Sequence, residues 1–381
     1  MRITFVSPPP NMTGGFRVIV IYAQQLMRMG HTVRIVSPPL QMSSLQKKLK
    51  SWLKGGGWPS NSIAPRSHLE GSGVAHRFLD RWRPVTDADV PDADIVIATW
   101  WETAEWVNEL SQSKGAKVYL IQHHEVFPHL EVRRSAATYR MPLHKIVVAR
   151  WLKEVMRDQY GDDVVDVVPN AVDHRQFFAS PRGKQTIPTV GLLYHTSRDK
   201  GLDVSLSALQ IARERIPRIH VVSFGSERLT EKFRLPPGAE FYFCPPQENI
   251  RALYSQCDVW ITASRTEGFN LPAMEAMACR APVVSTRAGW PEEEVITGVN
   301  GVLVDVEDYE AFAKGIEWVL SRSDADWRKL SENAYKTVAS ASWEASAKMF
   351  ETALEHACRR SASSQIAGRC ASIPKTKSLL L

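Results

Sequence analysis

Short apolar runs alternate with longer amphipathic segments from the start of the chain. The first run, 2–7, is followed by a loop with two glycines, an apolar-periodic segment over 16–29 and a second apolar run over 31–37. Short apolar runs flanked by turn residues are typical of buried strands, and apolar positions three and four apart are typical of helices. The first 37 residues therefore predict a strand, a helix and a second strand.

The same alternation continues as far as residue 359. Further strands are predicted over 94–99, 117–122, 145–149, 164–168, 189–194, 220–224, 240–244, 259–263 and 282–285. Further helices are predicted over 150–160, 202–216, 249–255, 309–322, 325–340 and 343–359, with a short one that begins at Pro272. Strands that alternate with helices form parallel sheets covered by helices on both faces. We therefore expect an α/β chain with two Rossmann-like, doubly wound domains.

Residues 41–83 interrupt this alternation. Leu45, Leu49, Trp52 and Leu53 share one helical face, lysines crowd the rest, and three glycines follow from Gly55. A basic amphipathic helix with tryptophan at its edge can lie in a membrane interface. We therefore expect 41–58 to contact an anionic membrane surface; the alternative is an ordinary surface helix that packs on its own domain.

Composition narrows the class of protein. The 381 residues are 44% hydrophobic and 23% charged, which is typical of a globular protein. No run of eighteen apolar residues predicts a membrane span, and the N-terminus turns polar too soon for a signal peptide. Five cysteines without a CxxC pair argue against a zinc site or a disulfide frame. A cytoplasmic chain is expected, with the inner face of the membrane as an alternative location.

The net charge of +6 is unevenly distributed. Residues 41–83 carry eight Lys/Arg and two acids, while residues 1–40 and 357–381 carry four and five Lys/Arg and no acid. The basic residues are therefore confined to the first part of the chain and its end. This distribution favours an anionic membrane or a phosphate-bearing acceptor over nucleic acid.

The stretch 258–284 contains the strongest candidate site. A predicted strand leads through Gly268 into the helix at Pro272, with Glu267 before the turn and Glu275 in the first helical turn. The backbone N–H groups of Gly268, Phe269, Asn270 and Leu271 precede the helix and point with its dipole. This turn predicts an anion cradle between two carboxylates that can bind hydroxyl groups. The alternative is a helix start with two solvated glutamates.

The residues of this stretch resemble a known family. The strings Glu267-Gly-Phe-Asn-Leu-Pro272, Glu275-Ala-Met-Ala and Pro282-Val-Val resemble the donor-site signature of the family 4 (group 1) retaining glycosyltransferases. Pro169-Asn-Ala-Val-Asp173 resembles the hinge signature of that family, with Ala171 in place of glycine. The resemblance covers most of 160–345 and implies a GT-B fold, in which two Rossmann-like domains face each other across a cleft.

The predicted division of the chain follows from this resemblance. Residues 1–170 would form the acceptor-side domain and 171–342 the nucleotide-sugar domain. Residues 343–359 would form a helix that crosses back to the first domain, as in the family. The Ser-rich basic tail, 360–381, is expected to be disordered.

The resemblance also implies roles for residues of the second domain. Glu275 would accept hydrogen bonds from ribose hydroxyls, and Glu267 would hold the donor sugar with the N–H groups of 268–271. Lys200, before Gly201, would bind the diphosphate. The arginine that the family usually has after the strand's glycine is missing, because Leu192 follows Gly191. Arg198 is expected to replace it; the alternative is a solvated loop cation.

Two places in the first domain match the family more loosely. Gly14-Gly15 resembles the glycine pair that lets donor and acceptor approach the backbone, and a plain tight turn is the alternative. His123 and His124 follow a predicted strand, where family members often place a histidine near the transferred sugar. We expect His124, or else His123, in that role; the alternative is a histidine pair bonded within a loop.

These expectations predict a metal-independent retaining glycosyltransferase. It would move a sugar from a nucleotide-diphosphate sugar to a saccharide or lipid-linked acceptor, in cell-surface polysaccharide synthesis. No cofactor, metal or nucleic-acid partner is expected, and the oligomeric state is left open. The alternatives are a non-catalytic GT-B scaffold that binds sugar nucleotides and a GT-B sugar-nucleotide epimerase.

Overall fold

The computed structural model describes residues 1–40 and 67–371, with side chains as far as residue 363. The expected amphipathic segment 41–58 lies outside the described residues. Backbone contacts divide the chain into two compact units. The first unit comprises 1–147, 153–168 and the chain from 347 onward, and the second comprises 148–152 and 169–346. Within the described residues, no helix is both long and apolar enough to cross a membrane.

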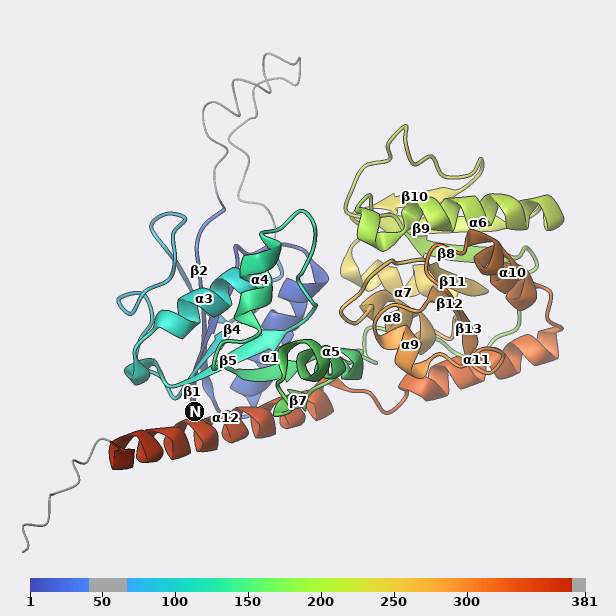
Figure 1. The fold of residues 1–381 in the computed structure, drawn as a ribbon. Helices are drawn as coiled ribbons and strands as arrows, with labels where there is room; N and C mark the ends of the chain where they lie inside the picture. The colour runs from blue at the N-terminus through green and yellow to red at the C-terminus, as the bar shows by residue number, and fades with distance from the viewer. Residues whose placement is uncertain (41–66, 372–381) are drawn as a thin grey trace, which may run out of the picture. The chain divides into compact units, whose positions relative to one another are not determined.

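The first unit is built on a parallel sheet of seven strands in the order β3-β2-β1-β4-β5-β6-β7 (Figure 1). The strands are β1 (Arg2–Val6), β2 (Thr32–Ser37), β3 (Ala75–Phe78), β4 (Ile95–Ala98), β5 (Ala116–Ile121), β6 (His144–Val147) and β7 (Val165–Val167). In the centre of the sheet, Phe5 of β1 lies opposite Ile35 of β2 and Ile97 of β4. These apolar runs are buried on both faces, which is why they lack the polar alternation of a half-exposed strand.

The helices of this unit are α1 (Gly14–Arg28), α3 (Trp101–Glu109), α4 (Val132–Thr138), α5 (Arg150–Tyr160) and α12 (Trp343–Ala371), with a short 3-10 helix at Gln112–Lys114. α5 and α12 each begin in residues that group with the second unit. Phe350 of α12 stacks on Tyr22 of α1 and on Phe5 of β1, with ring centroids 4.5 and 6.3 Å apart. The C-terminal helix is therefore part of the core of the first unit.

Two elements of the first unit differ from the prediction. β3 is a four-residue edge strand whose residues are mostly exposed, so it has no apolar run that could signal it. α12 continues to Ala371, beyond the predicted end at Arg359. Residues 360–367 contain no proline or glycine, and nothing in their sequence stops a helix there. Of the predicted disordered tail, 360–371 are therefore helical, and 372–381 lie outside the described residues.

The second unit is also a parallel sheet, with six strands in the order β10-β9-β8-β11-β12-β13. The strands are β8 (Thr189–Leu193), β9 (His220–Gly225), β10 (Glu240–Phe243), β11 (Val259–Thr262), β12 (Val283–Thr286) and β13 (Gly301–Val304). The helices are α6 (Leu202–Arg215), α7 (Gln247–Ser255), α8 (Leu271–Ala278), α9 (Trp290–Glu294), α10 (Tyr309–Leu320) and α11 (Asp324–Val338), with a 3-10 turn at Arg198–Lys200.

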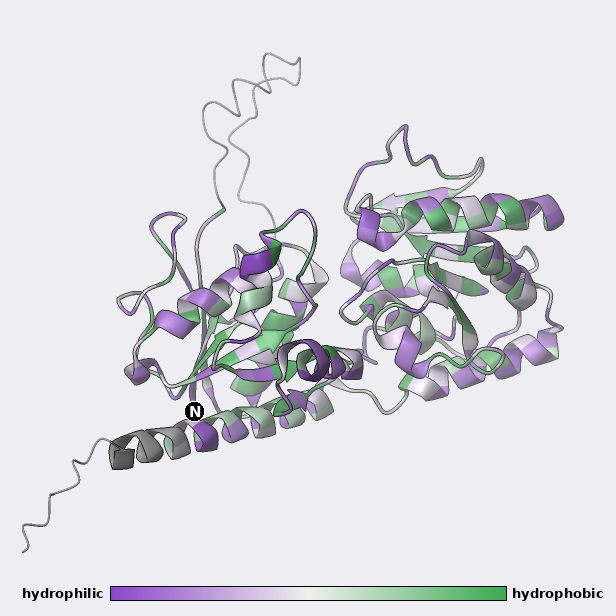
Figure 2. Cartoon of the chain, viewed as in Figure 1, coloured by the Kyte–Doolittle hydropathy of each residue, from purple (hydrophilic) through white to green (hydrophobic). Residues whose placement is uncertain are grey.

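The core of the second unit lies between this sheet and its helices. Val190, Ile261 and Val284 from the central strands pack with Leu209 of α6 and Phe312 of α10. Figure 2 shows the strands of both units as predominantly hydrophobic and the outer helices as mixed. The architecture is thus α/β with two Rossmann-like units, as predicted.

Both sheets reverse their strand order next to the first strand of the unit. In the first unit the reversal lies between β1 and β4, and in the second it lies between β8 and β11. In an open parallel sheet, the loops that leave the carboxyl ends of two such strands diverge and leave a crevice for a ligand. The residues that follow β8 and β11 are therefore the strongest candidates for a ligand-binding site.

Candidate functional site

An ion pair joins the two loops at the reversal point of the second sheet. Lys200, in the loop after β8, places Nζ 2.8 Å from each carboxylate oxygen of Glu267, in the loop after β11. Ser264 Oγ donates a third hydrogen bond to Glu267 Oε1 at 2.8 Å. Glu267 is 8% exposed, whereas the Lys200 side chain is 34% exposed. The structure thus brings together two of the predicted site residues and leaves the cation partly open to solvent.

Gly201 holds Lys200 in place. Its φ is +59°, and a Cβ added there would lie 1.8 Å from the backbone oxygen of Ala263 at the end of β11. Only glycine allows the two loops to approach so closely in this conformation. The Lys200-Gly201 pair is therefore required by the geometry that carries Lys200 to Glu267.

The loop between Glu267 and α8 has an unusual backbone. Asn270 caps α8 in the left-handed conformation, with φ of +79°, and donates a side-chain hydrogen bond to Thr262 Oγ1 at 3.0 Å. The carbonyl of Gly268 accepts from Trp151 Nε1, and that of Phe269 accepts from the Trp290 backbone. α8 begins at Leu271, one residue before the predicted start, and Pro272 occupies its second position.

The backbone N–H groups of this loop have no acceptor in the part of the chain that the structure describes. Among the described residues, none accepts a hydrogen bond from the N–H of Gly268, Phe269, Asn270 or Leu271. The loop is held through its carbonyl and side-chain groups, and the N–H groups lie at the positive end of the helix. This arrangement can bind an anion.

Glu275 is buried in α8, past the first turn and not within it as predicted, because the helix already begins at Leu271. It is 6% exposed, and Tyr254 OH of α7 donates to its Oε2 at 3.0 Å. A carboxylate has two oxygens with about four acceptor positions, so the hydrogen bond from Tyr254 by itself does not fill them. The assignment of ribose hydroxyls to Glu275 stays a prediction.

Arg198 differs from Lys200 in its surroundings. Its side chain is exposed, and no hydrogen bond or ion pair of its guanidinium is found among the described residues. Its carbonyl accepts from Arg265, which also pairs bidentately with Asp203 and donates one hydrogen bond from Nε to Glu307. Arg265 therefore braces the loop. The prediction that Arg198 replaces the missing arginine is left open.

His195 and Glu227 are two further residues that sequence reasoning did not select. His195 follows β8, and its Nδ1 lies 3.4 Å from Glu227 Oε1 and accepts from the Ser197 backbone at 3.1 Å. Burial lowers the pKa of His195, and the Glu227 carboxylate opposes that shift. The position of His195 directly after a central strand was the signal that could have identified it.

In the first unit, the glycine pair lies beside the end of β5. Gln122 Nε2 donates to the Gly15 carbonyl at 3.1 Å, and a Cβ on Gly15 would meet only the Gln122 side chain, at an ordinary 3.7 Å. The protein itself therefore does not require glycine at position 15. This leaves room for a ligand to approach the backbone there.

The two histidines after β5 have different environments. His124 Nε2 lies 2.7 Å from Tyr160 OH, and burial lowers the pKa of His124 to about 4. His123 contacts the His124 carbonyl through Nδ1 at 3.2 Å and packs edge-on against Phe127. His124 is therefore a neutral imidazole at physiological pH.

Glu125, the next residue, is a buried acid that sequence reasoning did not select. It is 2% exposed, and its Oε2 accepts from the Trp101 backbone at 2.8 Å and from Tyr119 OH at 3.2 Å. Burial raises the pKa of this carboxyl well above its usual range. Glu125 ties the start of α3 to the end of β5 and so fixes the loop that carries both histidines.

Comparison with known families identifies the second unit. Residues 172–337 match the model of the family described as glycosyl transferases group 1. Residues 172–337 are thus similar in sequence to a group 1 glycosyltransferase domain. The matched range contains Lys200, Glu267, Glu275 and the loop between them.

Curated relatives of the group 1 domain have different acceptors in their names. The chain is 33% identical over 174 residues to a D-inositol 3-phosphate glycosyltransferase of Corynebacterium urealyticum, an alignment that covers 42% of this chain and 41% of the relative. It is 29% identical over 196 residues to the D-inositol 3-phosphate glycosyltransferase of Corynebacterium diphtheriae, with 48% and 45% covered. A human phosphatidylinositol N-acetylglucosaminyltransferase chain is 23% identical over 204 residues, with 51% and 42% covered. The chain thus matches less than half the length of these relatives.

Solved structures match over nearly the whole chain. Sucrose-phosphate synthase from Thermosynechococcus elongatus has a TM-score of 0.71 at 17% identity and covers 93% of this chain and 98% of its own. The Anabaena protein HepE, in complex with UDP and glucose, has a TM-score of 0.70 at 15% identity, with 93% and 100% covered. At this identity the likeness concerns the fold, which is the predicted GT-B class.

Proposed function

We propose that the chain is a retaining glycosyltransferase that takes its sugar from a nucleotide-diphosphate sugar bound by the second unit. The observation that carries this proposal is the Lys200–Glu267 pair at the reversal point of the sheet, next to four backbone N–H groups without acceptors among the described residues. A cation, a row of N–H donors and a carboxylate together match a diphosphate bonded to a polyhydroxylated sugar.

The charge that develops on the departing diphosphate is the main problem for catalysis. As the bond between the sugar's anomeric carbon and the phosphate oxygen breaks, Lys200 and the N–H groups of 268–271 would stabilise the negative charge. Removal of one such preorganised donor typically costs about 3 kcal/mol of barrier. Glu267 keeps Lys200 extended toward the site and can accept hydrogen bonds from the sugar hydroxyls.

The acceptor hydroxyl would attack from the face that the phosphate leaves. Its oxygen bonds to the anomeric carbon, and its proton passes to the leaving phosphate oxygen, so the configuration is retained and atoms balance. Glu267 and Glu275 do not fit the pair of carboxylates that hydrolytic glycosidases place on either side of the bond. Glu267 is paired with a lysine and Glu275 is buried beside Tyr254.

The proposal extends to the acceptor substrate and to the location of the protein in the cell. We propose a saccharide or lipid-linked acceptor in polysaccharide synthesis, as part of a family 4 activity, with the basic segment 41–58 as a contact to an anionic membrane. The described cysteines are free, which supports a cytoplasmic location. UDP is the first nucleotide to test, because HepE was solved with UDP and glucose.

A thermal-shift screen against UDP, GDP, ADP and dTDP and their sugars tests the donor site. We expect one nucleotide to stabilise the protein, and we expect Glu275→Ala to weaken its binding about tenfold or more, because a charged acceptor for ribose is lost. Tyr254→Phe is the matched control, since it removes the hydrogen bond to Glu275 and keeps the carboxylate. Equal nucleotide affinity in wild type and Glu275→Ala would refute the role of Glu275.

Turnover separates the enzyme from its alternatives. A transferase releases sugar slowly from its donor to water, whereas a sugar-nucleotide sensor binds the donor without turnover and an epimerase changes the sugar while it stays attached. Chromatography of the donor after incubation distinguishes the three outcomes. Only release of free sugar together with nucleoside diphosphate supports the proposed activity.

A further inference from the structure

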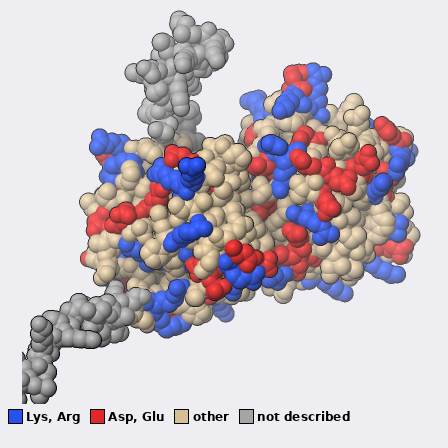
Figure 3. All heavy atoms as spheres, viewed as in Figure 1, with Lys and Arg blue, Asp and Glu red and all other residues tan. Residues whose placement is uncertain are grey.

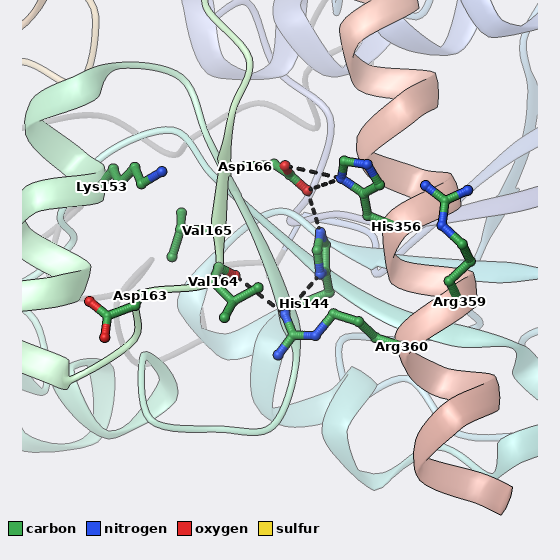
Figure 4. A pocket seen from close by; sticks show the side chains of 9 residues that line it. All are labelled: His144, Lys153, Asp163, Val164, Val165, Asp166, His356, Arg359 and Arg360. Atoms are coloured by element: carbon green, nitrogen blue, oxygen red, sulfur yellow. Dashed lines mark hydrogen bonds and ion pairs between the residues drawn. The ribbon is translucent and has the colours of Figure 1, made fainter.

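A polar cavity lies in the first unit, at the opposite end of the strands from the histidine loop. It has a volume of about 400 Å³ and sits beside β6, β7, α5 and α12 (Figure 4). His144 begins β6 and Val165 begins β7, so the cavity lies at the amino ends of these strands. His123 and His124 instead follow the carboxyl end of β5. The cavity is therefore separate from the residues assigned to the sugar.

A chain of hydrogen bonds fixes the protonation of the cavity's inner wall. Arg360 NH1 lies 3.1 Å from His144 Nδ1 and can only donate, so Nδ1 is an acceptor. His144 Nε2 therefore carries the proton and donates to Asp166 Oδ2 at 2.8 Å. His356 Nδ1 donates to the same oxygen at 3.1 Å. Asp166 thus has two imidazole donors, as the dashed lines of Figure 4 show.

Three cations of the cavity have no close carboxylate partner, or only an exposed one, among the described residues. Lys153 on α5 is exposed and has no partner among the described residues. Arg359 has only Glu355 among those residues, 3.7 Å away on the same helix, with 63% of its side chain exposed. Arg360 bonds His144 and the Val164 carbonyl, and no carboxylate of the described residues lies within 4.0 Å of it. Asp163 is the other acid in the lining.

The cations of a neighbouring cavity are arranged differently. That cavity, of about 910 Å³, shares His144 and Arg360 and is also lined by Lys117, Arg140 and Lys145. Lys145 is paired with Asp162, Lys117 donates to the Asn108 carbonyl, and Arg140 donates to the Gln159 carbonyl. Its additional cations are therefore engaged by the protein, whereas Lys153 and Arg359 remain available for an external anion.

We propose that the cavity between α5, β7 and α12 binds a phosphate group. Arginine guanidinium groups offer paired N–H donors that match phosphate oxygens, and lysine adds a compact charge. Because His356 Nδ1 donates to Asp166, Nε2 of the neutral ring is an acceptor and can bind a protonated phosphate oxygen; 42% of this side chain is exposed. The phosphate can belong to a lipid headgroup or to a soluble phosphorylated compound.

This site is independent of the proposed transferase activity, so it is tested by binding. Inorganic phosphate is titrated into the full chain by calorimetry at constant ionic strength. The test variant is Lys153→Ala/Arg359→Ala, which removes two exposed charges. The matched control, Lys329→Ala/Lys336→Ala, removes two lysines of α11 whose side chains are 79% and 67% exposed. We expect saturable binding in wild type and control, weakened about tenfold or more in the test variant.

A vesicle experiment distinguishes the two sources of the phosphate. The same three proteins are sedimented with phosphatidylcholine vesicles, with and without phosphatidic acid. Binding that depends on phosphatidic acid and is lost in the test variant alone assigns a lipid headgroup. Phosphate binding that is lost in the test variant while all three proteins sediment equally assigns a soluble ligand. Absence of saturable phosphate binding in wild type, or equal affinity in wild type and test variant, overturns the proposal.

Discussion

Lys200 Nζ lies 2.8 Å from both carboxylate oxygens of Glu267, although the two residues are 67 positions apart. The contact forms because β8 and β11 are neighbours in the sheet while the helices that follow them diverge. Each loop contributes one charged residue to the crevice, and neither loop could build the site alone. The pair links the fold of the second unit directly to its proposed chemistry.

Substitution of Lys200 by methionine should reduce turnover much more than stability. Methionine keeps most of the side-chain length but removes the charge that would stabilise the leaving diphosphate, so we expect kcat to fall about 100-fold or more. Stability should change by about 1 kcal/mol, because the Lys200 side chain is one third exposed and its ion pair is partly screened.

The control for this variant is Lys329→Met, an exposed lysine of α11 in the same unit. It removes the same charge at a distance from the reversal point and should leave donor turnover unchanged. Figure 3 shows acidic and basic side chains interspersed over the visible face. The loss of one surface lysine therefore changes the overall electrostatic field of the protein only slightly. Equal turnover in Lys200→Met and wild type would remove Lys200 from the mechanism.

Gly201→Ala should destabilise the second unit strongly. A left-handed conformation costs a non-glycine residue about 1–2 kcal/mol, and the added Cβ would also lie 1.8 Å from the Ala263 carbonyl oxygen. Gly238→Ala is the matched control, because Gly238 has a φ of +80° in the same unit and nothing within 4 Å of the added Cβ. Urea unfolding should show a clearly larger loss for Gly201→Ala. Similar losses would mean that the loops can separate without cost.

Much of the fold could be predicted from the sequence, because both sheets are parallel and buried. Runs such as Val259–Thr262 and Val283–Thr286 begin with consecutive apolar residues, are almost entirely buried and are bounded by turns, which makes their strand character evident. The edge strand Ala75–Phe78 lacks such a run and was missed. The helix end at Arg359 was also wrong, since no proline or glycine marked it, and α12 continues to Ala371.

The candidate site was predictable only where its residues share a local motif. Glu267, the loop 268–271 and Glu275 lie within nine positions and on one turn, so their proximity follows from the chain itself. The Lys200–Glu267 contact requires the strand order, and the bond from Tyr254 to Glu275 requires the packing of α7 on α8. His195 and Glu227 meet because β8 and β9 are adjacent. Such contacts have no local signature in the sequence.

Gly15→Ala separates a structural role of the glycine pair from a ligand-binding one. Gly15 lies in the first turn of α1 with ordinary space for a methyl group, so alanine should keep the stability or raise it by up to about 1 kcal/mol. If substrates approach the backbone there, the same methyl group should raise KM or lower kcat. Thermal unfolding and steady-state kinetics of one preparation measure both effects. Unchanged kinetics would leave Gly14-Gly15 as a helix start without contact to substrate.

The low pKa of His124 predicts an acid-sensitive first unit. Burial holds the pKa of His124 at about 4 in the folded chain, below the ordinary value of 6.5. Between these two values the unfolded chain binds the additional proton, so the free energy of unfolding must fall as the pH decreases from about 6.5 toward 4. At pH 5 this one histidine should lower the free energy of unfolding by about 1–2 kcal/mol after allowance for solvent screening.

Urea unfolding of wild type and His124→Gln at pH 7.5 and pH 5 measures how much of the acid-induced loss in the free energy of unfolding comes from His124. Glutamine keeps a polar side chain beside Tyr160 but does not titrate. Between the two pH values, the free energy of unfolding of the variant should therefore fall by about 1–2 kcal/mol less than that of wild type. His129→Gln replaces an exposed histidine in the same unit and serves as the control. It should retain the full acid sensitivity of wild type. The same acid sensitivity in His124→Gln and wild type would show that His124 has no part in it, and that another partly buried group, such as His76 with its pKa of about 4, causes the effect.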